Sequence, residues 1–259
     1  MPDAELPHAQ GTPCWLDMFA DDQSAALAYY GGQFGWTGEP NTEFGGYAVL
    51  SLGEQAVAGI SPVMPDTEPR PVTWNLYFAV DDIAATAELV GKHGGTVFVG
   101  PDEVPGTGKL AFAADPSGAA FGLWQAAPFP GFQVTGVHGA PAWFELETHQ
   151  GGACAEFYAA VFGIEAPTLP EMPGAYWLLT VGETQVAGIW QDPDTAGAPS
   201  SSPAWNPYFQ VTDTDAAVAS AVAAGASVVN EAKDSPYGRL AKLRDPQGAE
   251  YSIITPPAG

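Results

Sequence analysis

The strongest constraint on this chain is that it repeats itself. Residues 13–35 read PCWLDMFADDQSAALAYYGGQFG, and residues 141–163 read PAWFELETHQGGACAEFYAAVFG. The two segments align without a gap at an offset of 128, which is Trp143 minus Trp15. Since a repeated sequence specifies a repeated structure, we expect one half of the chain to be a copy of the other.

Each half is predicted to contain two strand-helix-strand-strand-strand units. Alternation over residues 14–19 predicts a strand, and Asp21 or Asp22 can cap a helix that ends at Gly35. Later turns read Asp-Pro-x-Gly at residues 115–118 and 245–248. The remaining predicted strands are 47–52, 54–60, 74–80, 96–99, 110–114 and 119–125, then 176–181, 183–190, 205–211, 227–230, 240–243 and 249–255, with helices over 83–92 and up to Gly163 and Gly225.

Segments rich in proline and glycine predict the domain boundaries. A flexible arm is expected at residues 1–11, a first domain at 12–125, a linker at 126–138 and a second domain at 139–255. Proline-rich segments at 61–72 and 191–203 are expected to form surface loops or lids.

Charge and cysteine usage limit the partners. Seven Lys plus Arg against 30 Asp plus Glu give a net charge of −23, which disfavours nucleic acid and anionic membranes. Cys14 and Cys154 form no CxxC motif, so we expect free buried thiols. The N-terminus lacks a signal-peptide pattern, and no apolar run approaches the ~18 residues of a membrane helix, so a cytoplasmic location is expected.

The paired repeat, with FYxxxFG at 157–163, YYxxxFG at 29–35 and two DPxG turns, resembles the vicinal oxygen chelate superfamily. That superfamily includes glyoxalase I, extradiol dioxygenases, and bleomycin and fosfomycin resistance proteins. The resemblance implies an α+β fold of two tandem glyoxalase-like domains. Each domain would pair βαβββ modules into curved, U-shaped mixed sheets, with helices on the convex side and the ligand on the concave side.

The resemblance also implies where a metal would be held. Family ligands lie seven residues before the helix-capping Asp on the first and middle strands, and seven residues after the Asp of DPxG on the last strand. Here these positions are Trp15, Trp143, Asn75, Asn206, Gly122 and Ser252. Indole and glycine offer no side-chain lone pair to a transition metal, so we predict neither a conventional metal centre nor another cofactor. The histidines, His8, His93, His138 and His149, all miss these positions.

The same concave faces would instead form an aromatic small-molecule site. Strand alternation adds seven candidate site residues to the six positions given above. They are Asp17, Phe19, Tyr77, Trp124, Glu145, Glu147 and Tyr208. Asp17 and Glu145, in one register on matching strands, could act as general bases, pair with a ligand amine, or be solvated strand ends. Trp15 and Trp143 could be ligand platforms or packing plugs, and Asn75 and Asn206 could serve structure alone.

We therefore predict a metal-independent binding protein that sequesters a small aromatic or amphipathic metabolite or antibiotic, as a monomer or a homodimer. One alternative is an enzyme of secondary metabolism, a lyase, isomerase or cyclase, in which Asp17 or Glu145 is the base. Another retains a metal through non-standard ligands such as Glu145, Glu147 and His149.

Overall fold

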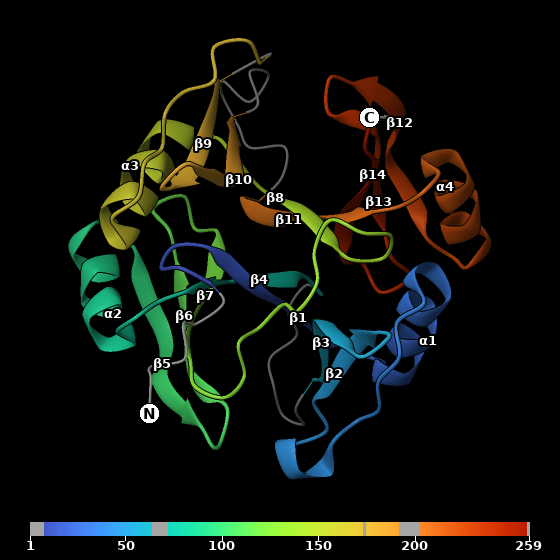
Figure 1. The fold of residues 1–259 in the computed structure, drawn as a ribbon, viewed down its shortest axis with the longest axis horizontal. Coiled ribbons are helices and arrows are strands. Elements are labelled where there is room, and N and C mark those ends of the chain that lie inside the picture. Colours follow the sequence, from blue (N-terminus) through green and yellow to red (C-terminus); the bar gives the residue numbers. More distant parts are fainter. Residues whose placement is uncertain (1–7, 64–71, 173–174, 192–201, 258–259) are drawn as a thin grey trace. The chain divides into compact units, whose positions relative to one another are not determined.

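The computed structural model describes residues 8–63, 72–172, 175–191 and 202–257 (Figure 1). Most of the arm predicted at 1–11, and most of the proline-rich loops predicted at 61–72 and 191–203, lie outside the described residues. Within the described part, no helix is long and apolar enough to cross a membrane.

The elements follow the predicted repeat. In the first strand-helix-strand-strand-strand repeat of each half, isolated β-bridges stand in place of the strand expected directly after the helix. These bridges include Thr37 to Ser51 and Thr168 to Trp177. The elements are β1 Pro13–Ala20, α1 Gln23–Phe34, β2 Ala48–Leu52, β3 Gln55–Pro62, β4 Trp74–Ala79, α2 Ile83–Lys92, β5 Thr96–Val104, β6 Gly108–Ala114, β7 Ala120–Ala126, β8 Pro141–Thr148, α3 Gly151–Phe162, β9 Ala175–Val181, β10 Thr184–Gln191, β11 Ala204–Gln210, α4 Thr214–Ala223, β12 Ser227–Ser235, β13 Gly238–Arg244 and β14 Glu250–Thr255, with a short 3-10 turn at Thr42–Phe44.

The strands form two seven-stranded mixed sheets, one from each half of the sequence. Their orders are β2-β3-β1-β4-β7-β6-β5 and β12-β13-β14-β11-β8-β10-β9, and both sheets are open. Parallel pairs such as β1–β3 and β4–β7 alternate with antiparallel hairpins such as β5–β6. The predicted α+β class and internal duplication are therefore confirmed.

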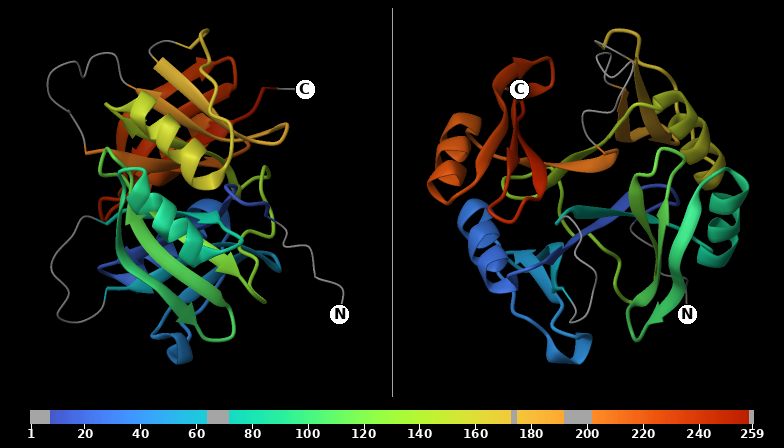
Figure 2. Two further views of the ribbon diagram at one scale, coloured as in Figure 1. Left: turned by 90° about the vertical axis from the view of Figure 1, so that its left-hand side faces the viewer. Right: turned by 180° about the vertical axis from the view of Figure 1, so that it is seen from behind.

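The chain also divides into two compact units that each take segments from both halves. Unit 1 is Met1–Trp15, Asn75–Gly131 and Phe144–Trp205, and unit 2 is Leu16–Trp74, Phe132–Trp143 and Asn206–Gly259. In unit 1, α2 packs beside α3, and in unit 2, α1 packs beside α4 (Figures 1 and 2). The predicted domain boundaries follow the sheets rather than these units, and they stay a prediction.

A buried tyrosine joins the two repeat motifs in the core of unit 1. Tyr158 of α3, which is 0% exposed, donates a hydrogen bond to Asp115 Oδ2 at 3.0 Å and accepts one from Trp205 Nε1 at 2.9 Å. Asp115 Oδ1 accepts from the backbone N–H groups of Ser117 and Ala119, which closes the Asp-Pro turn. One carboxylate therefore both shapes the turn and holds the helix.

Unit 2 contains the same arrangement. Tyr30 of α1 donates to Asp245 Oδ2 at 2.9 Å and accepts from Trp74 Nε1 at 3.2 Å, while Asp245 Oδ1 accepts from the N–H groups of Gln247 and Ala249. In each unit, the tyrosine of one half's helix motif thus meets the aspartate of the other half's turn motif. The positions of the two motifs in the repeat have a physical reason: they form a buried, satisfied hydrogen-bond network.

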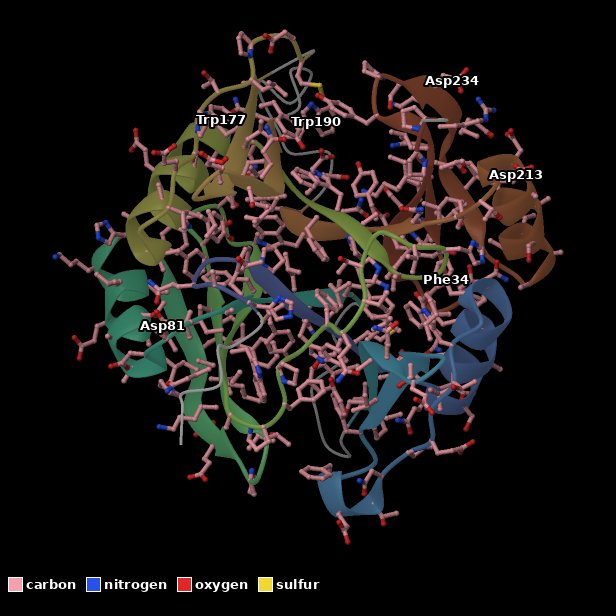
Figure 3. All side chains as sticks on the ribbon, viewed as in Figure 1. Phe34, Asp81, Trp177, Trp190, Asp213 and Asp234 are labelled. Atoms are coloured by element: carbon pink, nitrogen blue, oxygen red, sulfur yellow. The ribbon has the colours of Figure 1, made fainter. Side chains whose placement is uncertain are left out.

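The helix starts follow their capping residues. Aspartate side chains accept from first-turn N–H groups at α1, α2 and α4, the caps being Asp22, Asp82 and Asp213, the last labelled in Figure 3. Helix α3 lacks such a cap, and its first N–H, from Gly151, donates instead to Gln191 Oε1 at 2.9 Å. The ring of Trp177 lies where a Cβ of Gly151 would be, with 2.3 Å to Cζ3.

Candidate functional site

A carboxylate, a tyrosine and a glycine meet on the first three strands of unit 2. Asp17 of β1 is 4% exposed and pairs in parallel register with Gly59 of β3. Tyr47, just before β2, lies over Gly59 and donates from Oη to Asp17 Oδ2 at 3.3 Å. A Cβ at Gly59 would lie 1.9 Å from Tyr47 Oη, so only glycine admits this ring.

Unit 1 repeats the set with a glutamate. Glu145 of β8 pairs in parallel register with Gly188 of β10, and Tyr176 of β9 donates to Glu145 Oε2 at 2.8 Å. A Cβ at Gly188 would lie 1.8 Å from Tyr176 Oη. The structure thus pairs each predicted carboxylate with a tyrosine. Asp17 and Glu145 themselves belong to different units.

A carboxylate held in this way suits proton transfer or ligand binding. An ionised carboxylate has about four lone-pair positions, and the tyrosine hydrogen bond takes one of them. The bond fixes the direction of the group, which is a requirement for a general base. Glu145 is partly exposed, whereas Asp17 is buried. The two copies therefore share geometry but differ in access.

Sequence reasoning did not identify Tyr47 and Tyr176 as site residues. Both were predicted only to begin a strand, although they are equivalent (176 minus 47 is 129). Their partners Gly59 and Gly188 share that offset (188 minus 59 is 129). The sequence did contain one signal. In both halves a strand glycine and a tyrosine recur at the same offset, and this pattern is typical of a ring that packs across a sheet over a glycine.

We expect Gly188→Ala to destabilise the protein by about 1–3 kcal/mol, because the methyl group forces the Tyr176 ring away from the sheet and from Glu145. Urea unfolding measures the change. The control is Gly152→Ala in α3, where the added Cβ would be 3.6 Å from Trp177 and helix propensity favours alanine. Equal stability of Gly188→Ala and the unaltered protein would contradict this account of the ring.

Unit 1 presents a row of aromatic rings on the sheet face opposite its helices. Phe121 of β7 packs with Tyr158 of α3, so its neighbour Gly122 points the other way. Tyr77 of β4 lies over Gly122, with 2.1 Å from the ideal Cβ position to Cδ1, which repeats the tyrosine-over-glycine pattern. Its ring is followed by two more: Phe112 lies 5.3 Å from Tyr77, and Phe98 stacks 6.2 Å from Phe112.

Two predicted tryptophans lie near the end of β7 in the same unit. Trp15, 5% exposed, meets Phe129 edge to face at 4.9 Å. Trp124 lies 6.1 Å from the same ring and donates from Nε1 to the Phe129 carbonyl at 3.0 Å. Phe129 is thus the common partner, and it lies in the segment predicted as linker.

The remaining predicted residues lie on β1, β4, β8, β11 and β14. In unit 2, Asn206 Nδ2 donates to Ser252 Oγ at 2.8 Å, and Tyr208 pairs in register with Ser252. The side chains of other candidates are partly exposed; these are Phe19, Asn75, Trp143 and Glu147. The roles assigned to all these residues stay a prediction.

Four of the six family metal positions are occupied in ways that do not suit a divalent transition metal. At two of them the structure places a Trp15 indole against Phe129 and a Tyr77 ring over Gly122. At two others, the Asn206 amide and the Ser252 hydroxyl bond to one another. Among the described residues, no trio of His, Cys, Asp or Glu gathers as a metal cluster, and this includes the proposed set of Glu145, Glu147 and His149.

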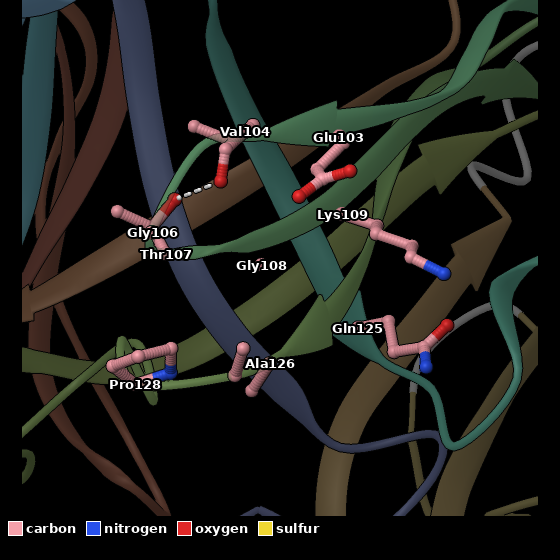
Figure 4. A pocket seen from close by; sticks show the side chains of 10 residues that line it. Glu103, Val104, Gly106, Thr107, Gly108, Lys109, Gln125, Ala126 and Pro128 are labelled. Atoms are coloured by element: carbon pink, nitrogen blue, oxygen red, sulfur yellow. Dashed lines mark hydrogen bonds between the residues drawn. The ribbon is translucent and has the colours of Figure 1, made fainter.

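A shallow pocket of about 220 Å³ lies elsewhere in unit 1, at the ends of β5, β6 and β7 (Figure 4). Its polar lining comprises Glu103, Thr107, Lys109 and Gln125, and Thr107 Oγ1 donates to the Val104 carbonyl at 3.1 Å. None of the predicted site residues lines it. We assign it no role.

Two family models match the chain, one in each half. The model described as Glyoxalase/Bleomycin resistance protein/Dioxygenase superfamily matches residues 7–123, and the one described as Glyoxalase-like domain matches residues 143–254. Both matches agree with the duplication found in the sequence.

Two relatives are similar to this chain over most of its length. The Mycobacterium tuberculosis protein named "Putative glyoxylase CFP32" is 39% identical over 255 residues, covering 96% of both chains. The Streptomyces peucetius protein named anthracycline biosynthesis protein DnrV is 38% identical over 263 residues, covering 95% of this chain and 94% of its own.

Solved structures share the fold at low identity. The 2,3-dioxygenase LapB from Pseudomonas sp. KL28 has a TM-score of 0.66 at 14% identity, covering 97% of this chain and 94% of its own. The Mn(II)-bound glyoxalase from Novosphingobium aromaticivorans has a TM-score of 0.63 at 15% identity, covering 95% and 82%.

Proposed function

Because this chain belongs to the glyoxalase/bleomycin resistance/dioxygenase superfamily, we propose that it binds a small, partly aromatic molecule on the sheet faces opposite its helices, without a transition metal. The observation that carries the proposal is the row of rings formed by Tyr77, Phe112 and Phe98. Phe98 is 54% exposed, an unusual position for a large apolar ring unless it contacts a partner or a ligand.

Charge and similarity support the ligand class. A net charge of −23 disfavours polyanionic ligands at long range, so a neutral or cationic organic molecule fits better. One relative is named for anthracycline biosynthesis, which agrees with a ligand from aromatic secondary metabolism. Sequestration of such a molecule, as in a resistance protein, requires binding alone.

Tryptophan fluorescence tests the proposal, because Trp15 and Trp124 lie in the same unit as the row of rings. A library of neutral and cationic aromatic metabolites is titrated into the full chain. Saturable quenching by at least one member supports binding. No saturable change across the library, repeated by calorimetry, rejects the proposal.

We expect Phe98→Ala to weaken binding of such a ligand up to about tenfold, since stacking contributes about 0.5–1.5 kcal/mol. Stability should change little because the ring is half exposed. The matched control is Phe44→Ala, a residue 42% exposed in the other unit, which should bind as the unaltered protein does. Equal affinities of Phe98→Ala and the control would exclude the row of rings as the binding surface.

A second candidate function is proton transfer next to a carbonyl, in an isomerase, lyase or cyclase. The observation that favours it is the tyrosine-held carboxylate, present as Asp17 with Tyr47 and again as Glu145 with Tyr176. If these carboxylates were only solvated strand ends, there would be no need in both copies for a glycine on the neighbouring strand to make room for the tyrosine ring.

A further inference from the structure

The C-terminal half differs from the N-terminal half at equivalent positions of its last two strands. Where the first half has Phe112 and Gly122, the second has Lys242 (242 minus 112 is 130) and Ser252 (252 minus 122 is 130). The aromatic face of unit 1 is therefore matched in unit 2 by a polar one. Two copies of one gene segment that diverge in this way need not bind the same chemical group.

Lys242 lies on the sheet face opposite the helices of unit 2. It pairs in antiparallel register with Ser252, and directly opposed residues project from the same face. The next residue of β14 toward the N-terminus, Tyr251, points the other way and packs on Tyr30 of α1. Among basic side chains in the described ranges, Lys242 is the one that is buried, at 8% exposure.

The charge of Lys242 is balanced within the sheet. Its Nζ lies 2.9 Å from Glu250 Oε2, and Arg244 also pairs with that carboxylate. Burial raises the pKa of Glu250, but hydrogen bonds from Lys242 and Arg244 outweigh burial and hold that pKa below its usual value. Lys242 and Arg244 thus share one carboxylate in a strongly acidic protein.

Asn206 adds a buried acceptor that none of the described residues satisfies. The residue is 4% exposed, and its Nδ2 donates to Ser252 Oγ, but its Oδ1 has no hydrogen-bond partner. Leaving a buried polar atom unpaired costs about 1–3 kcal/mol. Rotating the amide would not remove the problem, since Ser252 would then donate to Oδ1 and leave the Nδ2 hydrogens unpaired.

Ser252 complements this acceptor. Its Oγ accepts from Asn206, and a hydroxyl that accepts one bond keeps its own hydrogen for another. Asn206 Oδ1 and the Ser252 hydroxyl together form a neighbouring acceptor and donor, both buried on one face beside a lysine. A hydroxyl can satisfy both at one atom, because its hydrogen donates while its oxygen accepts.

We propose that Asn206, Ser252 and Lys242 form a recognition site for a phenolic or enolic hydroxyl. The ligand O–H donates to Asn206 Oδ1 and its oxygen accepts from Ser252, while the charge of Lys242 favours a hydroxyl whose oxygen carries partial negative charge over an aliphatic alcohol. Tyr208, in register with Ser252, supplies a flat neighbour for the conjugated system. This inference rests on the proposed function and specifies the ligand group that the site selects.

The test compares 2-naphthol with 2-methoxynaphthalene, which lacks the hydroxyl hydrogen, by calorimetry on the full chain. We expect the naphthol to bind about tenfold more tightly, because only it satisfies Asn206 Oδ1.

Asn206→Leu should abolish the difference in affinity between the two probes, and Lys242→Met should reduce it. Lys233→Met removes a charge from an exposed residue of β12 and should leave the ratio unchanged. Ser252→Gly, which copies Gly122 of the other half, replaces Asn206→Leu if that variant fails to fold.

Equal affinity of the two probes, or a ratio that persists in Asn206→Leu or Ser252→Gly, would overturn the hydroxyl site. If neither probe binds but members of the metabolite library do, this inference alone fails and the proposed function stands. If nothing binds, both fail.

Discussion

Above pH 10 the free energy of unfolding is expected to fall steeply, because the core of each unit keeps a tyrosine protonated. Burial, followed by the nearby charge of Asp245, raises the pKa of Tyr30 well above its usual value of 10, and burial with Asp115 does the same for Tyr158. Burial also raises the pKa of Tyr29 to about 12 and that of Tyr251 further.

The sign follows from proton linkage. Above pH 10 the unfolded chain loses these phenolic protons while the folded chain keeps them, so the unfolded state binds fewer protons and gains stability. The stabilisation is complete below the unfolded pKa and is lost as the pH rises toward the folded one. Each such tyrosine lowers the free energy of unfolding by about 1.4 kcal/mol per pH unit. Tyr30 and Tyr158 together give about 3 kcal/mol per unit, enough to exhaust a typical stability of about 5–15 kcal/mol within a few units.

Urea unfolding at stepped pH, with tyrosinate absorbance recorded in parallel, measures this slope. Tyr158→Phe should remove about 1.4 kcal/mol per pH unit from it. That variant also costs about 1–3 kcal/mol at neutral pH, since Asp115 loses a donor, so slopes rather than absolute values are compared. Tyr237→Phe, a residue 53% exposed, is the control and should keep the original slope. An unchanged slope in Tyr158→Phe would contradict the buried-tyrosine explanation.

Local signals predicted the elements well. Helix α2 runs over Ile83–Lys92 as predicted, and Asp22, one of the two predicted candidates, caps α1. These features depend on residues a few positions apart. The strand predicted at 96–99 extends to Val104, because two irregularities in its pairing with β6 carry it past Gly100 and Pro101, which resemble a strand end in sequence.

Long-range pairings were not predictable from the sequence. Tyr30 and Asp245 are 215 residues apart, and each motif was identified without its partner. Tyr47 reaches Asp17 only because Gly59 leaves room, which depends on strand register and on the direction of one side chain. The unsatisfied Asn206 Oδ1 can likewise be recognised only when the positions of the neighbouring side chains are known. Strand alternation indicates which residues share a face of a sheet, but it does not indicate these bonds.

If the protein performs proton transfer, Glu145→Gln is expected to reduce turnover by about 10²–10⁴-fold, because it removes a general base. Binding should change little, since the glutamine carbonyl can still accept the hydrogen bond from Tyr176. The corresponding change in the other half is Asp17→Asn, which preserves the bond from Tyr47 in the same way.

The two copies should not contribute equally. Glu145 is partly exposed and has the shorter tyrosine bond, 2.8 Å against 3.3 Å for Asp17. Asp17 is 4% exposed, which limits the approach of a substrate carbon to its carboxylate. We therefore expect the larger loss from Glu145→Gln and a smaller one from Asp17→Asn.

Deuterium exchange next to the carbonyl of a ketone identified in the fluorescence screen, followed by NMR, measures proton abstraction without a complete reaction. Tyr176→Phe tests positioning: it should slow exchange less than Glu145→Gln does and should shift the pH profile of the exchange rate, because the carboxylate loses a hydrogen bond that favours its charged form. Glu147→Gln, on the same strand and in register with Trp190, is the matched substitution. Exchange that is equally fast in Glu145→Gln, Asp17→Asn and the unaltered protein would assign the carboxylates to binding alone and leave sequestration as the function.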